Sequence, residues 1–180
     1  MIKIIAVLLF AFCGQVFAGH LTPAQYTTLK NYIQADGPMN AIPHTPDGAY
    51  AIAALFNIAA SPSFIVWRTD VPVSEIETGV GFDWTQVDNL TVGKDRIWQR
   101  MTARGTIDAS QTNVQAGIAE AWKGTAAMLA VQSYVLGVCK RPATVVEKLF
   151  AVGTGTTQSP AVMVFVGAIQ YTEITQAMGW

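Results

Sequence analysis

The sequence predicts a mainly α-helical protein, built as a compact multi-helix domain with a small β-hairpin near its C-terminal end. Apolar residues recur at helical spacing between most of the turn signals, and runs typical of strands are few. The 180 residues suffice for one domain with a core, and no internal repeat or linker interrupts them. We therefore expect a single mostly helical domain over residues 20–180, preceded by a separate apolar segment over residues 1–19.

Helix signals in the first half of the domain are capping residues followed by an apolar stripe. Thr22, Pro23 and Gln25 predict a helix start with a capping box, and Asp36-Gly37-Pro38 ends that helix. The following elements are expected to be a helix over residues 50–60, a short β-branched and aromatic strand over 63–69, and a helical turn over 73–78.

Tryptophans mark the core-facing sides of the next two helices. Trp98 lies on a helix that starts near Thr91, and Trp122 on one that follows a capping box at residues 108–111. Residues 126–138 are nearly all apolar, which predicts a helix buried on most sides. The remaining expected elements are a helix from Pro142 to Phe150, a flexible contact loop over Gly153–Pro160, a hairpin of strands 162–166 and 168–172 around Gly167, and a last helical turn over 173–178.

Residues 1–19 have the pattern of a secretory leader. Lys3 supplies a positive charge, Ile4–Phe12 is an apolar run, and Val16-Phe17-Ala18 resembles a cleavage site. The apolar run is short for a membrane span. A wrongly assigned start codon and an N-terminal arm that packs on a partner subunit remain as alternatives.

The composition indicates a protein whose surface is partly covered by partner proteins. Hydrophobic residues make up 51% of the chain and charged residues 13%, which leaves few charges for a solvated surface. Such a surface is typical of a protein that is partly covered by partners. The net charge of −1 gives no electrostatic basis for nucleic-acid binding.

The sequence offers little from which to build an active site. His20 and His44 do not form metal-ligand spacing, and no GxSxG elbow is present. The glycines of Gly153-Thr154-Gly155 follow a helix and precede no lysine, unlike those of a phosphate loop. Cys139 is expected to be a buried structural thiol. We predict no catalytic residue, metal or cofactor; a pocket built on His44 and Asp47 would be the only basis for an enzyme.

Interface residues are predicted instead. Aromatic residues and arginine are enriched at contact centres, glycines permit a loop to adapt, and an apolar strand needs cover. The residues that we expect to make contacts are Trp67, Arg68, Gly153, Gly155, Val162, Val164, Val166 and Trp180.

Several segments together resemble a family of small proteins that tailed bacteriophages and prophages encode in their head and tail morphogenesis gene cluster. In the first half of the chain they are residues 21–25, 46–53, 60–64, 66–69 and 87–90. In the second half they are Cys139-Lys140-Arg141, Ala143-Thr144, residues 147–151, Gly153-Thr154-Gly155 and Ser159-Pro160-Ala161. The resemblance extends over almost all of residues 21–180, and it rests on the combination of segments.

The resemblance implies a structural or assembly protein of the virion, of head-completion or adaptor type, at the head–tail junction. Its expected partners are portal, capsid or tail proteins and further copies of itself, with no nucleic acid or membrane. Its expected location is the virion, and the host cytoplasm during assembly. Similar proteins begin close to Leu21, without an apolar leader. If residues 1–19 are a signal peptide, the alternative is an exported helical domain that binds a ligand or partner in the periplasm.

Overall fold

The computed structural model describes residues 21–180. In it, threonine side chains cap the N-termini of several helices. Thr22 caps α1 (Pro23–Ala35) with the predicted capping box, in which the Gln25 side chain accepts from the Thr22 N–H at 2.8 Å. Each cap accepts a backbone N–H that the first helical turn leaves unpaired. The same role is filled by Thr45 for α3 (Pro46–Asn57), Thr125 for α7 (Ala126–Val138) and Thr144 for α8 (Val145–Phe150).

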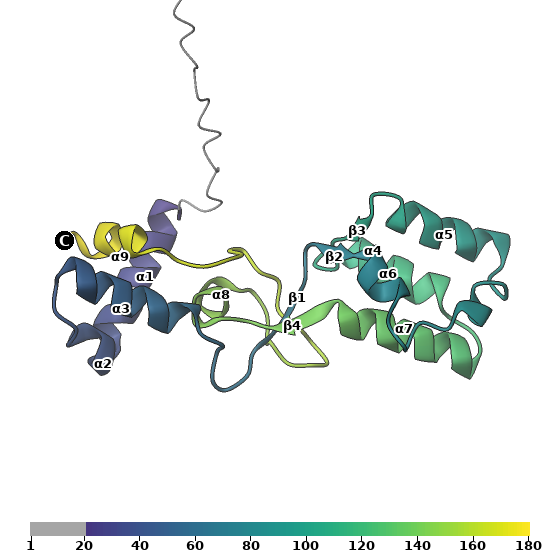
Figure 1. The fold of residues 1–180 in the computed structure, drawn as a ribbon, viewed down its shortest axis with the longest axis horizontal. Coiled ribbons are helices and arrows are strands. Elements are labelled where there is room, and N and C mark those ends of the chain that lie inside the picture. The colour runs from purple at the N-terminus through teal and green to yellow at the C-terminus, as the bar shows by residue number, and fades with distance from the viewer. Residues whose placement is uncertain (1–20) are drawn as a thin grey trace, which may run out of the picture.

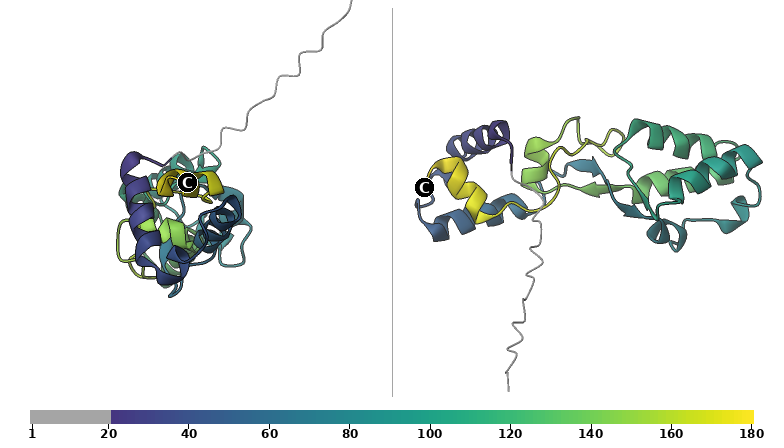
Figure 2. Two further views of the ribbon diagram at one scale, coloured as in Figure 1. Left: turned by 90° about the vertical axis from the view of Figure 1, so that its left-hand side faces the viewer. Right: turned by 90° about the horizontal axis from the view of Figure 1, so that it is seen from above.

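The helices form two lobes joined by a narrow waist (Figure 1). The base lobe contains α1, α2 (Gly37–Asn40), α3, α8 and α9 (Tyr171–Met178). The tip lobe contains β2 (Val71–Pro72), α4 (Val73–Glu77), the 3₁₀ helix η1 (Trp84–Gln86), α5 (Val92–Thr102), β3 (Thr106–Ile107), α6 (Thr112–Ala121) and α7. Seen from above, the lobes again lie at opposite ends of the molecule, and seen end-on they overlap (Figure 2).

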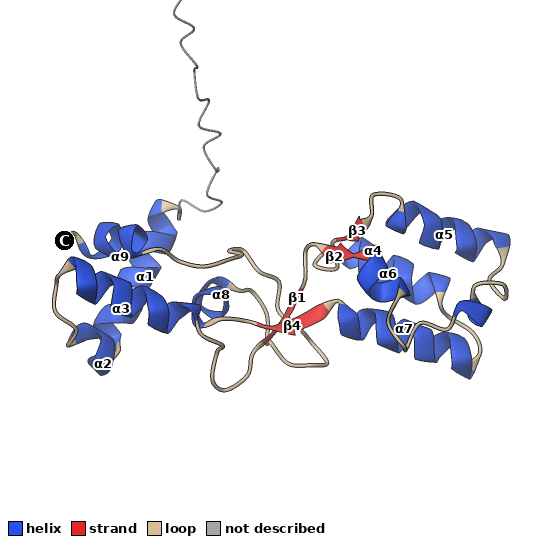
Figure 3. Cartoon of the chain, in the orientation of Figure 1, coloured by secondary structure: helices blue, strands red, loops and turns tan. Residues whose placement is uncertain are grey.

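The waist is built on two antiparallel strands, β1 (Ile65–Trp67) and β4 (Lys140–Pro142), with Val66 opposite Arg141. The chain leaves the base lobe along β1 and returns along β4, so the whole tip lobe lies between them in sequence. A second short antiparallel pair, β2 with β3, lies where the tip lobe begins. Elsewhere the described chain is helical or irregular (Figure 3), so the mainly α-helical class is confirmed.

Each lobe has its own hydrophobic core. In the base lobe, Leu29 and Ile33 of α1 pack with Phe56 of α3 and Ile174 of α9, all fully buried. The tip lobe encloses an aromatic group in which Phe82, Trp98 and Trp122 contact one another, while Trp84 packs edge-on against Phe82. Trp98 and Trp122 are buried, as predicted. The compact arrangement predicted for residues 20–180 is replaced by two separate cores with a small third cluster between them.

The predicted C-terminal hairpin is absent from the described residues. Val162 pairs with Val152, and Ala161 pairs with Val66 of β1, so the first expected strand belongs to the waist. Its expected partner is held elsewhere, because the Ile169 N–H donates to Asn57 Oδ1 at 2.8 Å and Asn57 Nδ2 donates to the Ile169 carbonyl at 2.9 Å. These bonds fix the chain before α9 to the end of α3.

Three helix predictions also need correction. The helix predicted over residues 50–60 runs from Pro46 to Asn57, because Thr45 caps it four residues earlier than expected. Residues 140–142 form β4, and α8 starts only at Val145, because Thr144 caps it and Arg141 is paired with Val66. Helix α7 has the predicted bounds but only one buried side, formed by Met128, Val131 and Val135. Its other side is apolar yet uncovered by described residues, because the tip lobe packs α7 against α4 and α6 from one direction.

Candidate functional site

Five of the predicted contact residues come together at the waist. Gly153 and Gly155 lie on the loop after α8, and Val162, Val164 and Val166 lie on the segment that leads from this loop toward α9. We call Val162, Val164 and Val166 the valine row. Because they come from one continuous segment beside β1, the waist is the part of the molecule where the sequence predictions converge.

The segment that carries the valine row is paired at its start and then unpaired. The Ala161 N–H donates to the Ile65 carbonyl at 2.9 Å, and Val162 exchanges two backbone hydrogen bonds with Val152 at 2.8 and 2.9 Å. From Met163 to Val166 the backbone makes no hydrogen bond to another described residue, and the chain bends at Val164 and Phe165. The described residues thus leave the backbone groups of this stretch without a hydrogen bond, as at the edge of a sheet.

Side chains along this segment alternate between the interior and the surface. Ala161, Met163 and Phe165 are buried, whereas the three valines between and after them are exposed, Val164 to 62%. Alternation of this kind is typical of a strand with one covered face. The sequence does not reveal this alternation, because the buried and the exposed positions of residues 162–166 are all apolar.

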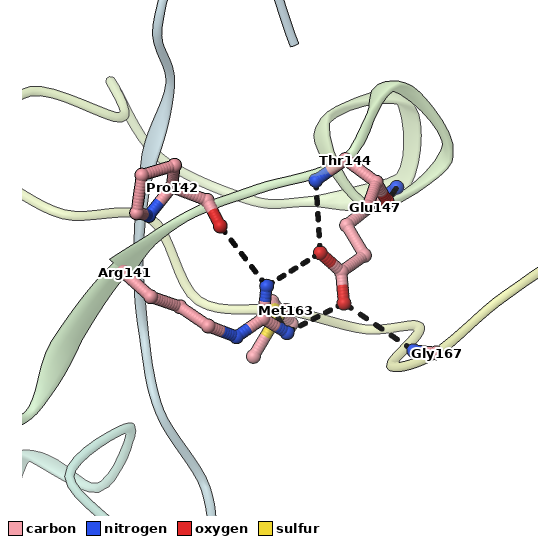
Figure 4. Close-up of polar contacts among 6 residues, drawn as sticks. All are labelled: Arg141, Pro142, Thr144, Glu147, Met163 and Gly167. Atoms are coloured by element: carbon pink, nitrogen blue, oxygen red, sulfur yellow. Dashed lines mark hydrogen bonds and ion pairs between the residues drawn. The ribbon is translucent and has the colours of Figure 1, made fainter. Parts of the chain in front are cut away.

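An ion pair between Arg141 and the buried Glu147 joins α8 to the segment that carries the valine row, and Figure 4 shows its contacts with Thr144, Met163 and Gly167. Glu147 is only 2% exposed and accepts two hydrogen bonds from the Arg141 guanidinium, at 2.6 and 2.7 Å. The same carboxylate accepts the N–H of Thr144 at 3.0 Å and the N–H of Gly167 at 3.3 Å. Arg141 in turn contacts the sulfur of Met163 at 3.3 Å. One side-chain pair thus connects β4, the start of α8 and both ends of the 163–167 segment.

These hydrogen bonds decide the charge state of Glu147. Burial alone raises the pKa of a carboxyl group, because the charged form loses its hydration. Here the bonds from Arg141, Thr144 and Gly167 outweigh burial, and the pKa of Glu147 lies below its usual value. The pair is therefore charged near neutral pH and makes charge-assisted hydrogen bonds.

The loop after α8 is tied to the waist. The carbonyl of Gly155 accepts the Ile65 N–H at 2.7 Å, and Lys140 Nζ donates to the Thr157 carbonyl at 3.0 Å. Gly155 lies directly against the ring of Phe64. The loop, Phe64 and Lys148 border an open depression of about 570 Å³. The loop that was predicted to make contacts is thus tied to β1 through the Ile65 N–H and to β4 through the Lys140 side chain.

Substituting alanine for Gly155 is expected to cost about 1–3 kcal/mol of stability. Gly155 has a φ of +66°, which a residue with a side chain rarely adopts, and an added Cβ would fall on the Phe64 ring. Chemical denaturation measures the loss. Gly137→Ala is the matched control, since Gly137 lies in α7 with free space around it, and should be neutral or slightly stabilising. Equal stability of the two variants would contradict the packing of the loop on Phe64.

The other three predicted contact residues are not part of the valine row, although the Trp67 N–H donates to the carbonyl of Ala161 beside it at 3.0 Å. Trp67 is buried in the core of the tip lobe, so the prediction that it offers an exposed aromatic contact is wrong. Arg68 forms an ion pair with Glu75 and donates to the Val138 carbonyl. Trp180 stacks on His44 at 4.3 Å between ring centres, in the base lobe.

The remaining chemical groups give no organised reaction centre among residues 21–180. No hydrogen bond or ion pair joins His44 to Asp47, and no three potential metal ligands lie together there. Cys139 is buried, as predicted, and burial raises the pKa of its thiol to about 11. Within the same residues, no helix has the length and apolarity needed to cross a membrane.

The sequence prediction missed Arg141 and Glu147 as organisers of the site. The pattern Thr144-x-x-Glu147 is a capping box, and it was available as a local signal for a helix start. The pairing with Arg141 depends on β4 meeting β1, which no local pattern indicates. Comparison of the chain with protein-family models, with curated proteins and with solved structures found no significant match.

Proposed function

We propose that this chain is a structural or assembly subunit of a tailed-phage virion, of head-completion or adaptor type, that acts at the head–tail junction through subunit contacts. The observation that carries the proposal is the valine row, with three exposed apolar side chains beside four residues whose backbone has no partner among residues 21–180. Exposed apolar residues combined with free backbone groups favour addition of a further extended segment.

The resemblance in the sequence supports the same surface. Its segments in the second half of the chain include Arg141, Thr144, Glu147, Gly153 and Gly155. These residues surround the valine row and hold it in place. The resemblance therefore includes the residues that form the waist.

The chemistry of the surface indicates the kind of partner. The valine row has no charge, and the neighbouring backbone offers both donors and acceptors. An extended apolar segment from a portal, capsid or tail protein would satisfy both features, since its backbone would pair and its side chains would cover the valines. The bend at Val164 and Phe165 limits such pairing to a short stretch.

The variant Val164→Asp with Val166→Asp tests this proposal. Two carboxylates on the covered surface should cost each subunit contact roughly 2–4 kcal/mol, a loss of affinity of about 30- to 700-fold. The measurement is the yield of infectious particles when a phage that lacks the gene is supplied with the variant. Thermal unfolding should show that the variant keeps its fold, because both valines are exposed.

Leu129→Asp is the control, because Leu129 is exposed on α7 in the tip lobe, away from the valine row. It should support a much higher particle yield than the double variant. A double variant that is folded and restores a normal yield would contradict the proposal.

A further inference from the structure

Charge is segregated within the tip lobe. Residues 70–90 contain five carboxylates and no basic residue, whereas residues 91–104 contain four basic residues and one carboxylate. The first segment leads from β2 through α4 and η1, and the second contains α5. In Figure 1, α5 forms the upper edge of the tip lobe, and the preceding segment reaches it from the lower side.

The acidic segment carries an exposed aromatic residue in its middle. We define the acidic patch as Glu77, Val80, Asp83, Trp84 and Asp88. Trp84 is 56% exposed, and its Nε1–H donates to the Glu77 carbonyl at 3.1 Å, which holds the ring beside the end of α4. The carboxylates of Glu77 and Asp88 make no hydrogen bond or ion pair with a described residue. Aromatic residues are enriched at contact centres, and unpaired charges around one can bind a partner of opposite charge.

The basic segment carries two arginines on α5 and a third in the turn that follows it. Arg96, Arg100 and Arg104 follow one another at intervals of four, and we call them the arginine row. All three are exposed, and none makes a hydrogen bond or ion pair with a described residue. The one carboxylate of α5, Asp95, accepts instead from Gln99 at 2.7 Å. Arg96 and Arg100 on α5 repel each other weakly at this spacing.

The two surfaces complement each other in charge and in apolar content. Val92 is exposed at the start of α5, as Val80 and Trp84 are on the acidic patch. None of the three ion pairs among the described residues joins the acidic patch to the arginine row. Because the described residues leave both surfaces without an ion pair between them, each is open to a second copy of the chain.

We infer that the arginine row of one copy binds the acidic patch of a second copy, so that tip lobes associate head to tail. A contact between two different surfaces of one chain repeats from copy to copy, and it closes into a ring when the rotation permits. The inference deepens the proposed function and rests on it for the need to place several copies in one particle. Nucleic acid is the less suitable occupant of the arginine row, because the neighbouring acidic patch repels a polyanion.

Charge reversal on either surface tests the inference in the full chain. One variant carries Glu77→Lys with Asp88→Lys, and the other carries Arg96→Glu with Arg100→Glu. Asp83 is left unchanged because it caps η1. Light scattering after size exclusion, at about 50 mM salt where charges are weakly screened, gives the mass of each species. Circular dichroism checks that each variant is folded.

The parent chain should form a species of at least about twice the monomer mass, and each variant alone should dissociate with a Kd raised about 100-fold or more. A mixture of the two variants should associate again, because opposite charges then face each other at both kinds of contact. Lys30→Glu, a charge change in the base lobe, should behave as the parent chain does.

Three outcomes would overturn the inference: a monomeric parent chain, variants that associate as the parent chain does, or a mixture that stays dissociated. Loss of binding to a 30-base-pair duplex in the Arg96→Glu, Arg100→Glu variant, with a monomeric parent chain, would assign the row to nucleic acid instead. The valine-row variant separates the two proposals, because Val164→Asp with Val166→Asp should lower particle yield and leave this self-association unchanged.

Discussion

Replacing Trp122 with alanine is expected to lower the free energy of unfolding of the tip lobe by about 3–5 kcal/mol. Trp122 is fully buried and packs edge-on against Phe82 and Trp98, with ring centres 5.5 and 5.3 Å away. Its removal leaves a cavity where α6 meets the aromatic core, and helices on both sides limit how far the cavity can close. Urea denaturation followed by circular dichroism and fluorescence measures the loss.

Because the base lobe has its own core, the tip lobe of this variant should unfold first, in a separate transition. Trp84→Ala is the control, since its exposed ring should contribute little to stability. Trp122→Phe should fall between the two, because it keeps part of the ring and removes an Nε1–H that has no hydrogen-bond partner among the described residues. If Trp122→Ala cost no more than Trp84→Ala, the aromatic group would not be the core of the tip lobe.

Replacing Glu147 with glutamine is expected to cost roughly 2–4 kcal/mol. Breaking a buried ion pair by removing one partner commonly costs about 3–5 kcal/mol, and the Arg141 side chain, one third exposed, recovers part of this from water. The neutral side chain also places an N–H₂ group where Arg141, Thr144 and Gly167 all donate. Glu75→Gln tests the same chemistry in the exposed pair with Arg68 and should cost less than about 1 kcal/mol.

The same residue predicts a dependence of stability on pH. The pKa of Glu147 is lower in the folded chain than the ordinary glutamate value of 4.5, so folding favours the charged form. Its contribution is complete above pH 4.5 and is lost as the pH falls through the lower folded pKa. Urea midpoints between pH 7 and pH 3 should therefore fall less steeply for Glu147→Gln than for the parent chain. Parallel pH profiles would contradict the role assigned to this carboxylate.

Local signals in the sequence were sufficient for most helices and insufficient for their arrangement. Thr22 with Pro23, and the apolar run over 126–138, gave the bounds of α1 and α7 because caps and periodicity act within a few residues. The division into lobes depends on β1 meeting β4, at opposite ends of the tip-lobe segment. Short strands with mixed side chains give no pattern that reveals such pairing.

The candidate site was predictable to a similar extent. The apolar run over residues 162–166 predicts a surface that a partner covers, and its three valines are exposed in the structure. The prediction that Trp67 makes interface contacts rests on its residue type alone. Its side chain is buried because β1 carries it into the core of the tip lobe. The prediction of a C-terminal hairpin is wrong because the Asn57 side chain binds the backbone of Ile169. This contact joins distant parts of the chain, so no local pattern indicates it.

The most direct test of the account is the protein content of tailed particles purified from the host strain. Quantitative mass spectrometry across a density gradient would measure whether this chain is present in the particles at a fixed ratio to the capsid protein. The chain is expected to sediment with intact particles, in several copies each. Its absence from the particles, together with recovery from the periplasm as a chain that lacks residues 1–18, would contradict the account and favour an exported binding domain.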